Sequence, residues 1–567
     1  MTAPAEPLRQ SYTCSTDAAP LIFDTLGRVL DATVARFPDR DALIVPFQGV
    51  RMTWREFGAR VDALAQGLLA LKIAPGDRVG LWSPNSVEWV LTQFATAKIG
   101  AVMVCINPAY RLSELEYVLN KVECTAIVSA DAFKTSEYLK MLLELAPEIP
   151  RCQPGMLESR RLPHLRTVIR MGAAKSPGMH SFDDVCRMGS LVERARLAEV
   201  GARLQADDAI NIQFTSGTTG SPKGATLTHA NILNNGWFVG EMQRFTEADR
   251  LAIPVPLYHC FGMVMGVLNC VTHGAAMVLP APVFDPLATL QAVQDERCTA
   301  LYGVPTMFIA ELDHPRFAEF DLTSLRTGIM AGAPCPVEVM KRVLHEMHMR
   351  EVTISYGMTE TSPVSFMTSP IDPLDKRVET VGRILPRLEG KIVDADGRVV
   401  PIGERGELCT RGYSVMLGYW GEEAKTREAV DAARWMHTGD LATMDAEGYV
   451  KIVGRIKDML IRGGENVYPR EIEEFLYRHP KVQDVQVFGV PDAKFGEEIC
   501  AWIVVKEGQV LDEAEVKAFC KGQIAHYKVP RYVRVVQAFP MTVTGKIQKF
   551  VMRAEMVQLL GLDEAGA

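Results

Sequence analysis

No stretch of the sequence has the length and apolarity of a membrane-spanning helix. The most apolar candidate, Cys260 to Pro280, carries Asn269, Thr272 and His273 near its middle. A spanning helix needs about 20 mostly apolar residues, and polar side chains are costly inside a bilayer. We therefore expect a buried helix followed by a strand here, and no transmembrane segment.

Targeting signals and paired cysteines are also missing. The first ten residues have no apolar core for a secretory signal. They contain one basic residue, Arg9, and one acidic residue, Glu6, which is not the pattern of a mitochondrial presequence. The 12 cysteines, scattered from Cys14 to Cys520, include no C-x-x-C pair. These features favour a protein of the reducing cytoplasm over one held together by disulfides or structural zinc.

The chain has no excess of positive charge. It has 61 Lys and Arg residues and 69 Asp and Glu residues, which gives a net charge of -8 at pH 7. Proteins that bind nucleic acid usually present a basic surface to the phosphates. We therefore expect no nucleic-acid partner.

The length and periodicity of the chain predict an α/β protein with several domains. The 567 residues are too many for one hydrophobic core. Thr53-Trp-Arg-Glu56 is a capping box that opens a helix to about Leu71, and a strand follows at Arg78–Trp82. Further helices are expected at about 86–98 and 113–121, and strands at 101–106, 126–128 and 209–214. This alternation favours largely parallel sheets.

The later part of the chain changes character. The pattern weakens between about 147 and 179, which predicts a long surface connection, and the turns at 394–397 and 445–448 predict a small antiparallel region. After Gly454 the sequence reads as an α+β unit, with helices at about 470–478 and 513–521 and strands at 485–490 and 499–505. We expect a large N-terminal domain of residues 1–454, a hinge at 455–457, and a small mobile C-terminal domain of residues 458–567.

Residues 215–224, Thr-Ser-Gly-Thr-Thr-Gly-Ser-Pro-Lys-Gly, are the most informative stretch. They follow the apolar strand at 209–214 and precede Thr228, a predicted helix N-cap, so the loop is expected between a strand and a helix, where backbone N–H groups can face an anion. Hydroxyl groups and the Lys223 ammonium suit a polyphosphate better than an ordinary surface turn. The residues predicted to contact ATP here are Thr215, Ser216, Gly217, Thr218, Thr219, Gly220, Ser221, Pro222 and Lys223.

This loop resembles the phosphate-loop motif of the adenylate-forming enzymes, the superfamily of acyl-CoA synthetases, peptide-synthetase adenylation domains and firefly-type luciferases. Further stretches resemble the superfamily in its order: 356–360 (Tyr-Gly-Met-Thr-Glu), 437–440 (His-Thr-Gly-Asp), Gly454-Arg455 and 540–549 near the end. The resemblance covers essentially the whole chain. The stretches at 107–110 and 115–119 resemble the medium-chain fatty acyl-CoA synthetases in particular.

The resemblance implies a role for each matching residue of the nucleotide site. Tyr356 packs against adenine, Thr359 contacts a phosphate, and Glu360 holds Mg²⁺ on the polyphosphate. Asp440 and Arg455 hold the ribose.

The resemblance also implies acyl, coenzyme A and hinge positions. His259 lines the carboxylate and acyl site, and Gly332 lets the acyl chain pass close to the backbone. Gly464 lies beside the pantetheine tunnel, Lys457 is the hinge residue, and Lys546 is the catalytic lysine, which also contacts ATP.

The activity implied by the resemblance is that of an acid–thiol ligase with two steps. A carboxylate attacks the α-phosphate of Mg·ATP to give acyl-adenylate and pyrophosphate, and the thiol of coenzyme A then displaces AMP. Lys223, Glu360, His259 and Lys546 are the expected catalytic residues. The mostly apolar or small residues at 237–267 and 332–366 favour a fatty or aromatic acid. The resemblance to the medium-chain synthetases implies a medium-chain fatty acid. Three alternatives stay open: transfer to a carrier protein in trans, a luciferase-type oxidase, and a catalytically inactive AMP sensor. Whether the protein is a monomer or a homodimer is also open.

Overall fold

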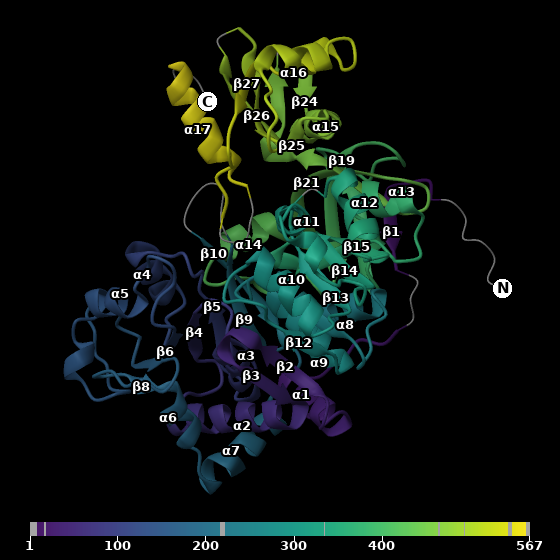
Figure 1. The fold of residues 1–567 in the computed structure, drawn as a ribbon. Coiled ribbons are helices and arrows are strands. Elements are labelled where there is room, and N and C mark those ends of the chain that lie inside the picture. Colours follow the sequence, from purple (N-terminus) through teal and green to yellow (C-terminus); the bar gives the residue numbers. More distant parts are fainter. Residues whose placement is uncertain are drawn as a thin grey trace, which may run out of the picture.

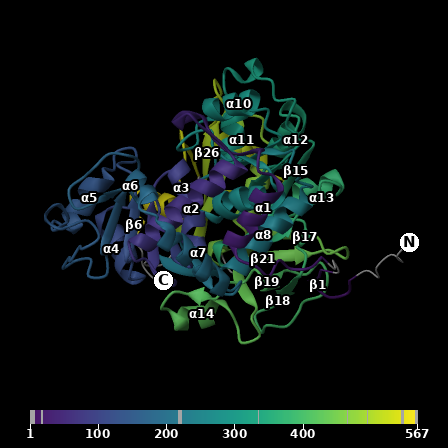
Figure 2. The ribbon, with the colours of Figure 1, turned by 90° about the horizontal axis from the view of Figure 1, so that it is seen from below.

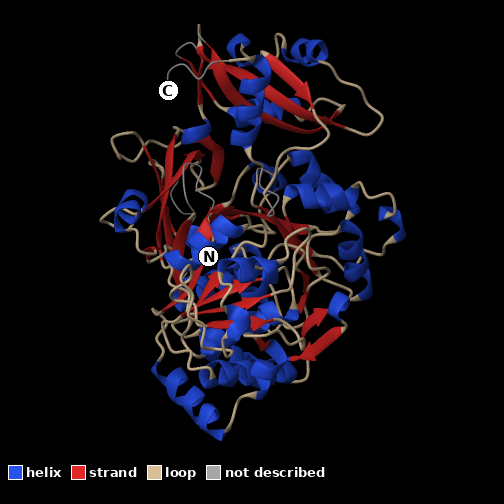
Figure 3. Ribbon diagram, turned by 90° about the vertical axis from the view of Figure 1, so that its left-hand side faces the viewer, coloured by secondary structure: helices blue, strands red, loops and turns tan. Residues whose placement is uncertain are grey.

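The computed structural model of the protein describes residues 8–15, 19–215, 222–333, 335–462, 465–492, 494–542 and 547–562. Three sheets of eight, nine and five strands form a large body, and a fourth sheet forms a smaller unit above it (Figure 1). In Figure 3 helices lie around the strands of the large body, as in an α/β fold. Among the described residues, no helix combines the length and apolarity needed to cross a bilayer.

The eight-stranded sheet carries the predicted phosphate loop. Its order is β20-β10-β9-β5-β4-β6-β7-β8, parallel from β9 to β8 and antiparallel at β10 and β20. The strands are β4 (Arg78–Trp82), β5 (Val102–Cys105), β6 (Ala126–Ser129), β7 (Thr167–Arg170), β8 (His180–Ser181), β9 (Ala209–Thr215), β10 (Lys223–Thr228) and β20 (Gly418–Tyr419). The expected strands at 78–82, 101–106, 126–128 and 209–214 are confirmed.

Helices cover this sheet and join it to the next. They are α1 (Leu26–Arg36), α2 (Trp54–Ala70), α3 (Val87–Lys98), α4 (Leu112–Lys121), α5 (Tyr138–Leu145), α6 (Phe182–Arg187) and α7 (Leu191–Arg203). The predicted capping box is confirmed, since Thr53 Oγ1 accepts a hydrogen bond from Glu56 N and the Glu56 carboxylate accepts one from Thr53 N. Figure 2 shows α1–α3 near the centre, between the region of α4–α6 and the antiparallel sheet.

The prediction of a surface connection at 147–179 is wrong in its second half. Strand β7 is mostly buried and pairs in parallel with β6. Leu157, Leu162 and Leu165 before it are buried as well. The strand has only four residues and lies among Pro, Arg and Gly residues, which obscure its pattern in the sequence.

The nine-stranded sheet has the order β17-β16-β15-β14-β13-β11-β12-β2-β3. Its strands are β2 (Asp41–Val45), β3 (Val50–Thr53), β11 (Arg250–Ala252), β12 (Ala276–Val278), β13 (Ala300–Gly303), β14 (Thr327–Ala331), β15 (Glu351–Gly357), β16 (Val364–Met367) and β17 (Arg383–Ile384). Its helices are α8 (His229–Met242), α9 (Asn269–His273), α10 (Pro286–Asp295), α11 (Pro305–Leu312), α12 (Val337–Glu346) and α13 (Leu374–Glu379). The buried helix and strand expected at 260–280 are confirmed as a π-helix (Phe261–Leu268) that continues into α9, followed by β12.

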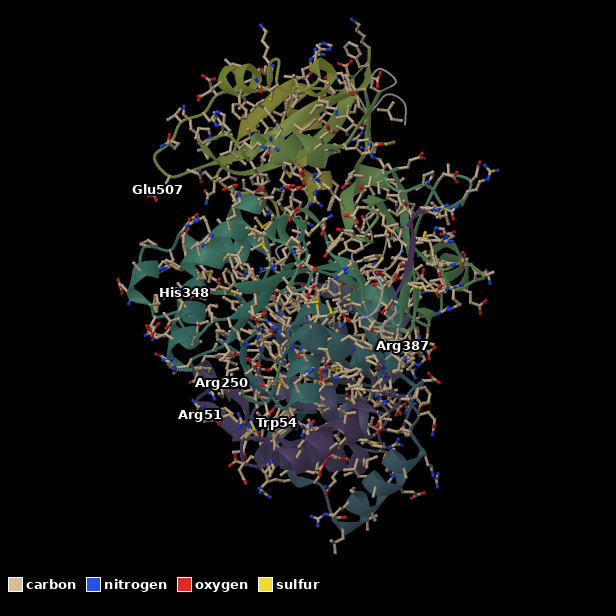
Figure 4. All side chains as sticks on the ribbon, turned by 90° about the vertical axis from the view of Figure 1, so that its right-hand side faces the viewer. Arg51, Trp54, Arg250, His348, Arg387 and Glu507 are labelled. Atoms are coloured by element: carbon tan, nitrogen blue, oxygen red, sulfur yellow. The ribbon has the colours of Figure 1, made fainter. Side chains whose placement is uncertain are left out.

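A charged network ties one flank of this sheet together. Asp41 on β2 accepts hydrogen bonds from Arg51 on β3 (2.9 Å) and Arg250 on β11 (3.0 Å). Glu296 joins the same two guanidinium groups at 2.7 and 2.9 Å. Figure 4 shows Arg51 and Arg250 close together, with Trp54 nearby and far from the small unit that carries Glu507. These charges therefore support the body rather than the predicted nucleotide site.

The five-stranded sheet is antiparallel, as predicted. Its order is β1-β18-β19-β21-β22, with β1 (Tyr12–Cys14), β18 (Leu388–Val393), β19 (Gly406–Gly412), β21 (Met436–Met444), β22 (Val450–Arg455) and the neighbouring helix α14 (Glu423–Ala429). Both predicted turns are present: Gly397 N donates to Asp394 O and Gly448 N to Asp445 O, each at 3.0 Å. Gly397 and Gly448 have φ of +78° and +83°, a region that favours glycine.

The small unit has apolar cores of its own. It comprises β23 (Leu460–Arg462), β24 (Glu465–Val467), β25 (Val482–Asp492), β26 (Gly496–Val505), β27 (Tyr532–Val535), α15 (Pro469–Leu476), α16 (Glu513–Cys520) and α17 (Lys549–Leu560). The predicted helices and strands of this region are confirmed. It touches the body where the Arg405 guanidinium lies 3.8 Å from the centre of the Tyr468 ring and where Gln483 donates to Asp313 at 3.3 Å.

Candidate active site

The predicted phosphate loop joins two antiparallel strands. Thr215 and Lys223 face each other across β9 and β10, and Thr228 at the end of β10 caps α8, accepting a hydrogen bond from Asn231 N at 3.1 Å. The cap prediction is confirmed, but the expectation that a helix directly follows the loop is wrong because β10 stands between them. The helix N-terminus therefore gives no argument for anion binding at this loop. Ser216, Gly217, Thr218, Thr219, Gly220 and Ser221 lie outside the described residues.

Lys223 and Glu360 are joined through Tyr419. The Lys223 ammonium donates to the Tyr419 hydroxyl at 3.1 Å and lies 4.2 Å from the centre of its ring. The hydroxyl in turn donates to Glu360 Oε1 at 2.7 Å. Burial and the nearby Glu360 carboxylate raise the pKa of Tyr419, so the phenol keeps its proton and stays a donor. Three segments far apart in the chain thus meet at one point.

The local fold explains how Tyr419 reaches this place. Strand β20 pairs with β10, which sets Tyr419 opposite Ala225, two residues after Lys223. Glu360 lies in the short 3-10 turn Thr359–Thr361 after β15, and its backbone oxygen accepts from Met416 N at 2.9 Å. The pairing of β10 with β20 was not predicted, and the sequence analysis therefore missed Tyr419. Glu360 offers a carboxylate oxygen, the type of ligand that Mg²⁺ prefers.

The predicted adenine and ribose residues form a second chain of contacts. Asp440 on β21 faces Arg455 on β22. Its Oδ2 accepts from the Tyr356 hydroxyl at 2.6 Å, and its Oδ1 accepts from Arg455 Nε at 3.1 Å. Burial, followed by the charge of Asp440, raises the pKa of Tyr356 well above its usual range. An aromatic ring and a carboxylate with both oxygens oriented by donors are suited to a purine and to ribose hydroxyls.

Glu407, which the sequence analysis also missed, holds the turn before Asp440. Its Oε1 accepts from Gly439 N at 3.0 Å, and its Oε2 lies 2.9 Å from His437 Nδ1. Gly439 has a φ of +71°, so this turn adopts a conformation that favours glycine. Glu407 lies on the neighbouring strand β19, and only the pairing of β19 with β21 shows the connection.

His259, predicted to line the acyl site, lies at the start of the π-helix. Its Nδ1 accepts from Phe261 N at 3.3 Å. The adjacent Cys260 contacts Gln213 of β9, with its Sγ 3.0 Å from Gln213 Oε1. Burial raises the pKa of the Cys260 thiol well above its usual range, and the neighbouring Cys105 and Glu360 raise it further. The contact with Gln213 places the start of the π-helix against β9, the strand that precedes the predicted phosphate loop.

Gly332 follows strand β14 with a φ of +86°. A Cβ at this position would meet Val304 Cγ1 at 3.2 Å, so both conformation and space favour glycine. This local geometry explains the glycine by itself, and the passage of an acyl chain beside it stays a prediction.

Two predicted residues of the small unit, Gly464 and Lys546, lie outside the described residues. The strands next to Gly464 are paired, with Arg462 opposite Glu465, and Met541 forms a bridge with Ile547 on either side of 543–546. Lys457 lies in the 3-10 turn Ile456–Asp458, directly after the end of β22. The predicted hinge thus begins at Arg455, the last residue of β22.

Comparisons with known proteins agree with the predicted resemblance. The family model for the AMP-binding enzyme matches residues 30–420, and the model for the AMP-binding enzyme C-terminal domain matches residues 471–546. The chain is 49% identical over 558 residues to the mitochondrial medium-chain acyl-CoA ligase ACSF2 of Danio rerio, covering 98% of this chain and 92% of that protein.

Solved structures give the same picture. The chain is similar to the anthranilate CoA ligase AuaEII in complex with anthranoyl-AMP, with a TM-score of 0.84, 28% identity, and coverage of 96% of this chain and 99% of that one. It is also similar to a Mycobacterium tuberculosis fatty acyl CoA synthetase, with a TM-score of 0.71, 29% identity, and coverage of 94% and 99%.

Proposed function

The chain belongs to the AMP-binding enzyme family, and on that basis we propose that it joins a medium-chain fatty acid to coenzyme A through an acyl-adenylate. The observation that carries this proposal is the pair of contact chains Lys223–Tyr419–Glu360 and Tyr356–Asp440–Arg455. The first supplies charge for a polyphosphate, and the second supplies a ring and a carboxylate for adenosine. The 49% identity to a medium-chain acyl-CoA ligase supports the choice of acid.

In the first step, a carboxylate oxygen of the acid attacks the α-phosphorus of ATP and pyrophosphate leaves. Positioning and charge stabilisation dominate such a displacement. Lys223, held by Tyr419, neutralises phosphate charge, and Lys546 provides a second cation at the reacting centre. Glu360 would hold Mg²⁺, which screens the charge of the pyrophosphate group.

Adenosine is held while this happens. Asp440 accepts hydrogen bonds from the ribose hydroxyls, and the Tyr356 and Arg455 donors keep its two oxygens oriented. Thr359 and the hydroxyl groups of Thr215, Ser216, Thr218, Thr219 and Ser221 complete the proposed phosphate contacts. We place His259 beside the carboxylate of the acid, which is the attacking group.

In the second step, the thiol of coenzyme A loses its proton and its sulfur attacks the acyl carbon of the adenylate. A thioester forms and AMP leaves. We place the pantetheine path beside Gly464 and the hinge at residues 455–457, between a domain of residues 1–454 and a domain of residues 458–567. A rotation of the small domain about Lys457 would move Lys546 away from the adenylate and bring Gly464 next to it.

The deciding experiment is an assay of AMP release with ATP, Mg²⁺ and coenzyme A. Acetate, straight-chain acids of graded length and benzoate are compared, and the highest kcat/KM is expected for a medium-chain acid. Turnover that does not need coenzyme A would favour another acceptor, and ATP-dependent oxygen uptake would favour an oxidase. No AMP with any acid would contradict the proposal.

We also propose that the protein works in the cytoplasm. The free cysteines of the described chain suit a reducing compartment and support this, whereas the relative from Danio rerio is described as mitochondrial. Fractionation of cells that express the full chain tests this location, and recovery with a particulate fraction would contradict it.

A further inference from the structure

A thiol, an imidazole and a carboxylate converge beside the turn that carries Asp440. Glu407 and Cys409 are two residues apart on β19 and so share a face of the sheet, and His437 lies opposite Cys409 on β21. Cys409 Sγ is 3.6 Å from His437 Nδ1, which is 2.9 Å from Glu407 Oε2. All three atoms lie within 4.8 Å of one another, and no other group of this kind is found in the described part of the chain.

We propose that Glu407, Cys409 and His437 bind Zn²⁺, and that the bound ion weakens the binding of ATP. Zinc takes sulfur, imidazole nitrogen and carboxylate oxygen in a tetrahedral set, at bond lengths that place neighbouring ligand atoms roughly 3.3–3.8 Å apart. The distance from Sγ to Nδ1 already has this length, and the distance from Nδ1 to Oε2 needs to open only slightly. A thiolate and an imidazole favour zinc over the Mg²⁺ of the ATP site.

The surroundings of the cluster suit an ion that enters from solvent. Cys409 is fully buried, packed with Val393 and Trp435, and forms the floor. The side chains of Glu407 and His437 are 22% and 32% exposed and form the open side. Water fills the fourth position around the ion.

The ligands of the cluster must lose protons when they bind zinc. Burial and the charge of Glu407 raise the pKa of Cys409 to about 12, so the free residue is a thiol. On binding, the S–H bond breaks, the sulfur bonds to zinc, and the proton passes to solvent. His437 Nδ1 carries a proton toward Glu407 Oε2, and this proton must leave Nδ1 when the nitrogen bonds to zinc. Asp431 Oδ2, 3.9 Å from His437 Nε2, lies where a small approach lets it accept a proton from Nε2 in the metal-bound tautomer.

Glu407 couples the cluster to the nucleotide. Its second oxygen accepts from Gly439 N, next to Asp440. When Oε2 turns toward an ion, this contact loosens and the turn that orients Asp440 shifts. By linkage, ATP must then weaken zinc binding by the same factor, which we expect to be about tenfold. This coupling rests on the proposed function, whereas the binding of the metal does not.

Titration of the chelator-treated full-length protein with Co²⁺ tests the site. Cobalt replaces zinc in such sets and gives a thiolate-to-metal charge-transfer absorption. We expect one ion per chain, displaced by Zn²⁺, in the wild type and in Cys500→Ser, a matched change of a fully buried thiol on β26. Cys409→Ser should lose the absorption while retaining its thermal unfolding transition. Asp431→Asn, which leaves all three ligands in place, should weaken cobalt binding about tenfold.

The outcomes separate the two parts of the proposal. Absence of the absorption in the wild type, or its survival in Cys409→Ser, overturns the metal site. The coupling is tested by the Kd of ATP, measured directly by calorimetry with and without Zn²⁺. An equal Kd overturns the coupling, and a Kd raised by zinc in the wild type but not in Cys409→Ser supports it. A protein that lacks ligase activity would still give a clear result in the cobalt titration.

Discussion

Tyr419 donates a hydrogen bond to Glu360 at 2.7 Å, and its aromatic ring lies against the Lys223 ammonium at the same time. One phenol therefore fixes both an anion and a cation of the proposed phosphate site. Lys223 is held at the start of β10 by this contact, close to the position that the phosphates of ATP would occupy. The arrangement lets the effect of the hydroxyl be separated from that of the ring.

Tyr419→Phe should slow adenylate formation while leaving the fold intact. The change removes the hydrogen bond to a charged carboxylate, worth about 1.5–3 kcal/mol, together with the weaker one that Lys223 donates, and keeps the ring beside Lys223. We expect ATP–pyrophosphate exchange to fall roughly tenfold to a hundredfold. The matched control is Tyr12→Phe, which removes an exposed tyrosine–glutamate hydrogen bond of 2.7 Å to Glu389. Equal exchange rates in both variants would show that the Tyr419 hydroxyl does not contribute to the proposed phosphate site.

Lys546→Ala and Gly464→Leu should separate the two half-reactions. The first removes the cation that we propose near the α-phosphate, so exchange should be lost while supplied acyl-adenylate is still converted to thioester. The second narrows the proposed pantetheine path, so exchange should persist while thioester formation is blocked. Measuring both half-reactions for both variants checks this. Equal loss of the two steps in each variant would contradict the model with two domain positions.

Arg405→Ala should loosen the small unit from the body. The guanidinium lies 3.8 Å from the centre of the buried Tyr468 ring, a cation–π contact worth about 0.5–2 kcal/mol. We expect faster proteolytic cleavage near residues 455–457, by roughly the factor of 2 to 30 that this energy represents. The exposed Arg398, paired with Asp396, provides the control variant Arg398→Ala. Unchanged cleavage in Arg405→Ala would show that this contact does not hold the unit.

Asp484→Asn should change how stability depends on pH. Burial raises the pKa of Asp484 to about 6 from its usual 3.8, so the folded protein binds more protons than the unfolded chain between these values. The contribution of this carboxyl group to stability is thus fully present below about pH 4 and is lost as pH rises through 6, up to about 3 kcal/mol.

Urea unfolding at several pH values measures this effect. The free energy of unfolding of Asp484→Asn should rise relative to that of the wild type between pH 4 and 6, since the amide does not ionise. The exposed Asp207 provides a control in Asp207→Asn. A constant difference between the wild type and Asp484→Asn across this range would refute the assignment.

Local patterns predicted local structure well. The capping box at Thr53 and the cap at Thr228 are present, because such caps depend only on residues three positions apart. Strands β7 and β10 were missed. β7 lies in a stretch rich in Pro, Arg and Gly, and β10 follows directly on a loop rich in Gly, Ser and Thr. Without β10, the phosphate loop was wrongly placed directly before a helix.

The proposed site shows the same limit. Tyr356, Asp440 and Arg455 were predicted from the resemblance and lie together in the structure. Tyr419 and Glu407 act through strand pairs, β10 with β20 and β19 with β21. No pattern within a single stretch encodes such pairs, so these two residues could not be identified before the fold was known.

The position of Arg455 has a consequence for how the nucleotide is kept between the two steps. Arg455 faces Asp440 at the end of β22, and the proposed pivot follows it directly. When a body rotates, displacement grows with distance from the axis, so atoms next to the axis hardly move. The adenosine half of the intermediate would lie close to that axis and keep its contacts. The far end of the small unit would be displaced much more. The reactive adenylate would thus stay anchored throughout, with no need to be released and recaptured in water.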